Sequence, residues 1–131
     1  MDYTTAVNIL GHHSGWEPNL QVKSLSSSLQ PFERKLINKK EFDNIKDAIQ
    51  AVYFHFKGEE KIDRKIFKYI NSILEDIYNF AIEEDSPLRS NKLISTEQLN
   101  FLRKFHDEVR GMVYNLLIDR DPDGARFEEP Y

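Results

Sequence analysis

Three long segments of the chain repeat apolar residues at spacings of three and four, which is the pattern of an amphipathic α-helix. They cover residues 41–57, 62–82 and 95–117. The apolar arc of the second segment spans nearly half of a helical wheel, so we expect this helix to contact two or more neighbours. No segment of the sequence shows the sustained alternation of a β-strand. The pattern therefore predicts an all-α fold, an antiparallel helical bundle of about four helices.

Capping residues mark the predicted ends of these helices. Asn38 is a suitable N-cap for the first, with Glu41 three residues later to bond back to the amide of the cap. Gly58 follows that helix and suits the left-handed conformation with which many helices end. Ser95, or the threonine after it, is the predicted N-cap of the third helix, with Gln98 three residues after Ser95.

Weaker patterns fill the rest of the chain. Residues 25–36 predict a shorter helix, and residues 4–10 predict one or two further helical turns. We expect a single helical domain, with the bundle over residues 25–118, an N-terminal arm and loop over residues 1–24, and a flexible acidic tail over residues 119–131.

A glycine lies inside the third predicted helix, at Gly111. Glycine there costs about 1 kcal/mol relative to alanine in an exposed helix interior. We therefore expect a close contact between this position and a neighbouring backbone.

The composition limits the class of protein. With 131 residues, 40% of them hydrophobic and 31% charged, the chain is long enough for one domain with one core. No stretch approaches the roughly 18 uninterrupted apolar residues of a membrane span, and the first residues do not have the pattern of a signal peptide. We expect a soluble, cytoplasmic protein with no membrane partner. The absence of cysteine excludes disulfides, thiolate metal sites and cysteine nucleophiles.

Signals of catalysis are missing. The sequence has no Gly-x-Ser-x-Gly elbow and no phosphate-binding glycine loop, so we predict no cofactor and favour a protein that is not an enzyme. His12 and His13 are adjacent in a predicted loop over residues 11–19, and they lack the i, i+4 spacing with which a helix presents two histidines to one metal.

One weak metal motif lies in the tail. Asp119, Asp121 and Asp123 match the first, third and fifth positions of a calcium-binding loop, with a glycine at the sixth. The twelfth position, where a bidentate glutamate is needed, is Pro130. A solvated acidic tail is the simpler interpretation, and we predict no metal site.

His106 is the most informative single titratable residue. It lies within the apolar arc of its helix, with Arg103 and Arg110 three before and four after it on the same side. This ridge is a candidate anion-binding site, in which positive charge lowers the pKa of the imidazole. The simpler interpretation, which we favour, is a boundary histidine hydrogen-bonded across the bundle, with arginine stems covering its edge.

A basic stripe follows one side of the second long segment. A stripe of this kind can contact an acidic partner or a phosphate backbone, but the net charge of −4 disfavours nucleic acid and a solvated face is expected. The stripe consists of Lys61, Arg64, Lys65 and Lys68.

Aromatic residues supply a candidate partner surface. Phe54 falls about 140° from the centre of its apolar face by helical geometry. Other aromatic residues stand at the rims of their stripes or near them, and aromatic side chains are enriched in the cores of protein interfaces. The competing interpretation is that the N-terminal segment covers some of them. The predicted partner-binding set is Phe54, Tyr69, Tyr78, Phe101 and Tyr114.

The sequence therefore favours a small non-catalytic helical module that binds another protein or a second copy of itself as a dimer. A regulator, an adaptor, an inhibitor and an immunity or antitoxin-like protein all fit this description. The alternative is a helical bundle that handles nucleic acid or a phosphate ligand, centred on Arg103, His106 and Arg110.

Overall fold

The computed structural model describes residues 1–30 and 36–126 and contains no strand within them. Helix η1 is a π-helix that continues α4, and η2 is a single 3-10 turn that follows α6. The elements in chain order are α1 (Tyr3–Ser14), α2 (Leu25–Ser28), α3 (Lys39–Phe56), α4 (Arg64–Ile77), η1 (Tyr78–Ile82), α5 (Pro87–Ser90), α6 (Thr96–Leu117) and η2 (Pro122–Ala125).

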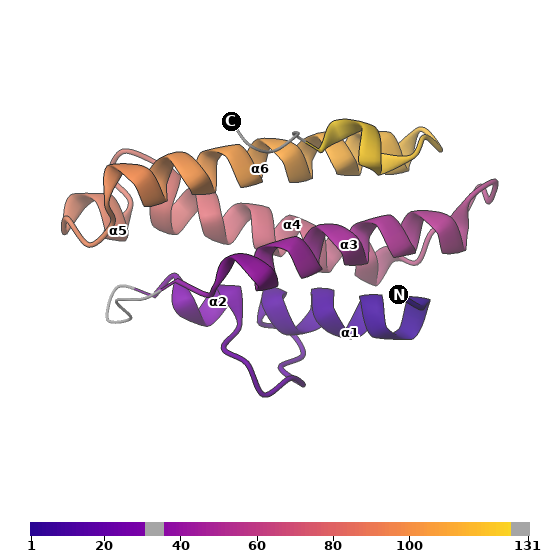
Figure 1. Cartoon of the computed structure of the whole chain (residues 1–131), viewed down its shortest axis with the longest axis horizontal. Coiled ribbons are helices and arrows are strands. Elements are labelled where there is room, and N and C mark those ends of the chain that lie inside the picture. The colour runs from indigo at the N-terminus through magenta and orange to yellow at the C-terminus, as the bar shows by residue number, and fades with distance from the viewer. Residues whose placement is uncertain (31–35, 127–131) are drawn as a thin grey trace.

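The four longer helices form an antiparallel bundle, as the sequence predicts. Figure 1 shows α3 and α4 in the middle, α1 and α2 on one side of them, and α6 on the opposite side. The ring of Tyr3 stacks on His55 with the ring centres 3.8 Å apart, so the start of α1 lies at the end of α3. At the other end of the bundle, Tyr78 lies beside His106 of α6.

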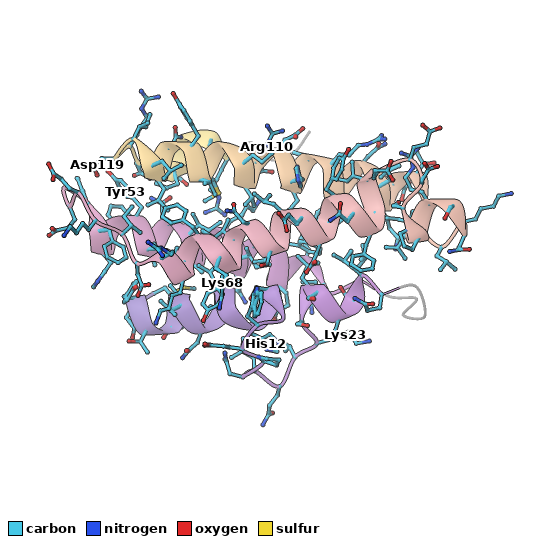
Figure 2. The ribbon with its side chains drawn as sticks, turned by 180° about the vertical axis from the view of Figure 1, so that it is seen from behind. His12, Lys23, Tyr53, Lys68, Arg110 and Asp119 are labelled. Carbon is cyan, nitrogen blue, oxygen red and sulfur yellow. The ribbon has the colours of Figure 1, made fainter. Side chains whose placement is uncertain are left out.

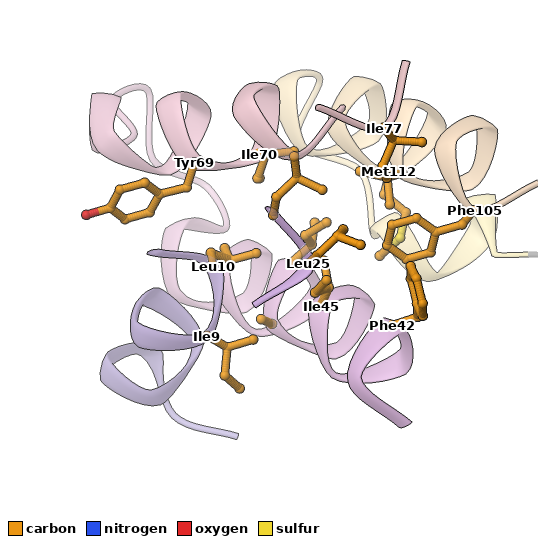
Figure 3. Close-up of a cluster of buried hydrophobic side chains, with 14 of the residues drawn as sticks. Ile9, Leu10, Leu25, Phe42, Ile45, Tyr69, Ile70, Ile77, Phe105 and Met112 are labelled. Atoms are coloured by element: carbon orange, nitrogen blue, oxygen red, sulfur yellow. The ribbon is translucent and has the colours of Figure 1, made fainter. Parts of the chain in front are cut away.

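The core confirms the apolar stripes. Figure 3 shows the buried cluster, to which α1 contributes Leu10, α3 contributes Ile45, α4 contributes Ile70 and α6 contributes Met112. All four side chains are fully buried. One contiguous core therefore joins the four helices, and burial of apolar surface is the main stabilising contribution to such a fold.

The predicted helix caps are present, with one difference. Ser95 and Gln98 form a complete capping box, in which each side chain bonds the backbone amide of the other at 3.1 and 2.9 Å. The Asn38 side chain accepts from the amide of Glu41 at 3.2 Å. The Glu41 carboxylate does not bond back to the cap as predicted; it lies 3.2 Å from Nε2 of His13.

The N-terminal segment is part of the bundle, which corrects the expected arm over residues 1–24. Helix α1 continues to Ser14 and packs along α3 and α4. His12 and His13, predicted to lie in a loop, form its last turn and are 3% and 0% exposed. Helix α2 corresponds to the first turn of the helix predicted over residues 25–36. Residues 31–35 of that prediction lie outside the described ranges.

The imidazole of His12 holds the loop that follows α1. Its Nε2 donates to the carbonyl of Val22 at 2.7 Å. Its Nδ1 accepts from the backbone amides of Asn19 and Leu20 at 3.1 and 3.2 Å, so this nitrogen carries no proton. One buried ring thus satisfies three backbone groups of a segment that has no regular structure.

The imidazole of His13 joins three helices. Its Nδ1 accepts from the amide of Leu25 at the start of α2, at 3.1 Å, and its Nε2 donates to the Glu41 carboxylate of α3. Burial lowers the pKa of His13 below its usual value, and the bond to Glu41 opposes this shift only in part. The ring is therefore neutral in the folded chain.

The neutral His13 ring predicts a pH dependence of stability. Because its pKa is lowered in the folded chain, the unfolded chain takes up the proton more readily, and the free energy of unfolding falls as the pH drops below about 6.5. Above that pH the contribution is fully present. We expect the urea midpoint of the wild type to fall more steeply between about pH 7.5 and 5.5 than that of His13→Gln.

His55→Gln is the matched control, because His55 is exposed on the surface of α3. This variant should keep the pH dependence of the wild type. The role assigned to His13 would be wrong if the urea midpoint fell by the same amount between about pH 7.5 and 5.5 in the wild type and in His13→Gln.

The described part of the tail is packed on α3 and α6, which corrects the expected flexible tail. Gly58 has the left-handed conformation predicted for it, with a φ of 80°. Its amide donates to both carboxylate oxygens of Asp119 at 3.1 and 3.2 Å. Gln50 donates to Asp121, and the guanidinium of Arg126 lies 3.0 Å from a carboxylate of α3. These bonds to α3 and to the turn after it hold the tail in place, although the composition of the tail favours disorder.

Gly111 makes room for this tail. A Cβ added there would lie 3.1 Å from the Cβ of Ala125 in η2, tighter than ordinary van der Waals contact. The predicted close contact is therefore present, with the neighbour being a side chain of the tail.

This contact predicts non-additive effects on stability. Gly111→Ala gains about 1 kcal/mol of helix propensity, but it crowds η2, so we expect most of the gain to be lost. In an Ala125→Gly background the same substitution should recover the gain, because the opposing methyl is gone. Urea unfolding of both single variants and the double variant measures the coupling, and strictly additive free energies would contradict the contact.

Candidate functional site

The predicted aromatic residues do not form one surface. Phe54 and Tyr114 are 59% and 61% exposed. Phe101 packs edge to face against a phenylalanine of α3, with ring centres 4.9 Å apart, and lies about 20 Å along α6 from Tyr114 at 1.5 Å per residue. Tyr78 projects from η1, at the end of α4. Phe101 and Tyr78 are thus separate from the first pair.

Tyr69 is a buried core residue, which corrects its place in the predicted partner surface. It is 1% exposed, and its ring packs against α1 where Gly11 leaves space. Burial, followed by a hydrogen bond to Glu17, raises the pKa of Tyr69 to about 12. The competing interpretation, that the N-terminal segment covers part of the aromatic set, holds for this residue.

A cavity of about 200 Å³ lies at one end of the bundle, where α3 and α6 end and α4 begins. We call it the end cavity. Figure 2 shows Tyr53 and Asp119 together at this end, with Arg110 further along α6. The apolar and aromatic lining residues are Tyr53, Phe56, Ile62, Phe67, Leu116 and Leu117, and the acidic ones are Glu59, Glu60 and Asp119.

Two chain turns place the acidic residues. After α3, the positive φ of Gly58 turns the chain, and the exposed Glu59 and Glu60 follow directly. After α6, Asp119 itself adopts a positive φ of 57°, which is uncommon for a residue other than glycine. The bonds from the Gly58 amide to the Asp119 carboxylate join the two turns, so the three carboxylates border one cavity.

Tyr53 is the buried polar residue of this cavity. The residue is 5% exposed, and its hydroxyl makes no hydrogen bond to a described residue and is not enclosed away from solvent. The end cavity therefore offers an accessible hydrogen-bonding group beside its carboxylates.

Exposed apolar side chains lie at the same end of the bundle as the end cavity. Phe54 packs against the ring of Tyr53 with the ring centres 5.3 Å apart. Leu117 lines the cavity although it is 60% exposed, and Tyr114 and Ile118 lie on the same side of α6 at the spacing of one helical turn. We call Phe54, Tyr114, Leu117 and Ile118 the end surface.

Sequence reasoning placed only Phe54 and Tyr114 in this region. It assigned Leu117 to the buried stripe of its helix, and it overlooked Ile118. The signal was present in the three consecutive apolar residues at 116–118, because side chains 100° apart cannot all face one core. The contribution of Tyr53, Glu59 and Glu60 depends on two loops meeting in space, and no local pattern contains it.

The basic stripe is exposed, as expected for a solvated face. The Nζ atom of Lys68 lies 4.4 Å from the centre of the Trp16 ring, a cation–π contact, and the Nζ atom of Lys65 lies 3.9 Å from Asp63. Two of the four basic side chains, Lys65 and Lys68, therefore contact groups of the same chain. Binding of an acidic partner by this stripe stays a prediction.

His106 is partly buried on α6. Burial, followed by the charge of Arg110, lowers the pKa of His106, and a hydrogen bond to the backbone of Leu74 opposes the shift. The ring of His106 also lies 6.4 Å from that of Tyr78, centre to centre, at the end of α4. Arg103 and Arg110 are exposed on α6, and binding of an anion between them stays a prediction.

The three aspartates of the weak calcium motif each contact another group of the chain. Asp119 accepts from Gly58, Asp121 accepts from Gln50, and Asp123 lies 3.8 Å from Arg126. Over residues 1–30 and 36–126, no group of three or more histidine, aspartate or glutamate residues is arranged to hold a metal ion.

A second hollow, of about 330 Å³, lies between the first turns of α3 and α6. Phe42 and Phe101 contribute its aromatic lining. Leu36 and Ile37, which precede α3, also line it.

Comparison with known proteins finds no relative: no family model, no curated protein and no solved structure matches the chain. Among the helices of the described residues, none is long and apolar enough to cross a membrane. Functional assignment therefore depends on the surfaces and cavities of this chain.

Proposed function

We propose that the chain is a small, non-catalytic helical module that binds another protein through the end surface. The observation that carries this proposal is the exposure of four large apolar side chains at the end of the bundle that holds the cavity. Phe54, Tyr114, Leu117 and Ile118 are 59%, 61%, 60% and 42% exposed. Single exposed apolar residues are common on protein surfaces, whereas several large ones at one end of a bundle, one of them lining a pocket, favour an interface.

The arrangement resembles the core of a protein interface. Binding energy in such interfaces concentrates in a few aromatic or apolar anchors that fill pockets and exclude water around them. The end cavity is such a pocket, and Phe54 and Leu117 flank it from α3 and α6. A catalytic role is not needed to explain the position of any of these residues.

Charge favours a different protein over a second copy of the same surface. A symmetric dimer brings the same patch of both subunits together. Glu59, Glu60 and Asp119 of one copy would then face the same carboxylates of the other, and like charges in contact are destabilising. A partner segment with positive charge among apolar residues avoids this repulsion.

The test is affinity capture followed by a binding measurement with purified components. We expect a protein retained from a lysate of the source organism to bind wild-type chain stoichiometrically. Phe54→Asp and Tyr114→Ser should each weaken its binding by about tenfold or more, which corresponds to about 1.4 kcal/mol. Isothermal titration with the purified partner measures the change.

Tyr78→Ser is the matched control, because Tyr78 is also an exposed tyrosine but lies at the end of α4, away from the end surface. This variant should bind as the wild type does, and circular dichroism should show the same helix content for all variants. Unchanged affinity of Phe54→Asp and Tyr114→Ser, or capture of nucleic acid alone, would contradict the proposal.

A further inference from the structure

We infer that the end cavity binds one cationic side chain of the partner, a guanidinium or alkylammonium group on its aliphatic stem. This inference rests on the proposed function and names the chemistry of the group that enters the cavity. Three observations support it: the size and lining of the cavity, the fixed carboxylate at its border, and the unpartnered hydroxyl of Tyr53.

The size of the cavity suits a single long side chain. Pockets for drug-sized ligands and cofactors usually measure about 300 to 1,000 Å³. The end cavity, at about 200 Å³, is smaller. Phe56 and Phe67 provide aromatic rings that attract a cation, and Leu116 provides apolar surface for the methylene groups of its stem.

The charged groups at the cavity all have one sign. Its three charged lining residues are carboxylates, and none of its described lining residues is basic. Asp119 is held in place because both of its oxygens accept from the Gly58 amide, and a carboxylate has lone pairs for further donors. Since ionised carboxylates only accept hydrogen bonds, a complementary group must donate them and carry positive charge.

Tyr53 supplies the third observation. The residue is 5% exposed, it lines the cavity, and its hydroxyl bonds to no described residue while remaining accessible. The N–H groups of a guanidinium or an ammonium can donate to this oxygen. Such a bond would replace a bond to solvent, and it would lie beside the aromatic lining.

An organic cation fits the cavity better than a metal ion does. A metal site brings three or more ligands to one point, and the described residues contain no such group of carboxylates and histidines. Aromatic and aliphatic lining residues also add nothing to the binding of a hard metal ion, whereas they stabilise an arginine or lysine side chain.

The probes for a direct test are three capped amino acids: the Nα-acetyl methylamides of arginine, lysine and citrulline. Citrulline has nearly the shape of arginine but no charge. Titration into the ¹⁵N-labelled chain should shift the amide resonances of Glu60, Leu117 and Asp119. We expect the arginine or the lysine compound to bind about tenfold or more tightly than the citrulline compound, and added salt should weaken this binding.

Three variants locate the site. Asp119→Asn keeps an oxygen that can accept from Gly58 but removes the charge, and it should weaken binding of the cationic probe by about tenfold or more. Tyr53→Phe removes only the hydroxyl and should also weaken binding. Glu97→Gln is the matched control, because Glu97 is exposed at the far end of α6, and it should bind the probe as the wild type does.

Equal shifts with the citrulline compound, no shifts with any compound, or unchanged binding by both Asp119→Asn and Tyr53→Phe would overturn the inference. Its failure is distinguishable from failure of the proposed function. If Phe54→Asp weakens binding of the partner but Asp119→Asn does not, the end surface binds a protein and the inferred cation site is wrong. If the probe binds but Phe54→Asp leaves the affinity for the partner unchanged, the cavity is a cation site and the proposed docking surface is wrong.

Discussion

Two adjacent buried imidazoles at the end of α1 hold together the parts of the chain that have little regular structure. His12 fixes the loop through the carbonyl of Val22, and His13 connects the start of α2 to the first turn of α3. With its last turn held in this way, α1 lies antiparallel along α3, and its first residue Tyr3 stacks on His55 at the opposite end.

The long helices could be predicted from sequence because their information is local. Apolar period and caps lie within a few residues of each other, as in the capping box of Ser95 and Gln98. The last turn of α1 was missed because Gly-His-His-Ser-Gly has neither an apolar period nor good helix formers. The bonds that stabilise this turn join His13 to Leu25 and Glu41, which are 12 and 28 residues away.

The candidate site was predictable to a smaller extent. Phe54 was found because a helical wheel places it outside the apolar arc, and it is exposed. Tyr69 was assigned to the surface because the helix that covers it, α1, was not fully recognised. Glu59 and Asp119 are polar loop residues in the sequence. They border the same cavity because the Gly58 amide joins the turn after α3 to the turn after α6.

The end cavity separates stability from recognition. Apart from the exposed Leu117, its apolar lining residues belong to the core or pack against it, so changes in them alter the stability of the bundle. Glu59 and Glu60 are exposed loop residues, and exposed charges contribute little to stability. The charge at the mouth can therefore change without loss of the fold. Under the proposed function, one scaffold is kept while the charged groups around the pocket determine which partner side chain it accepts.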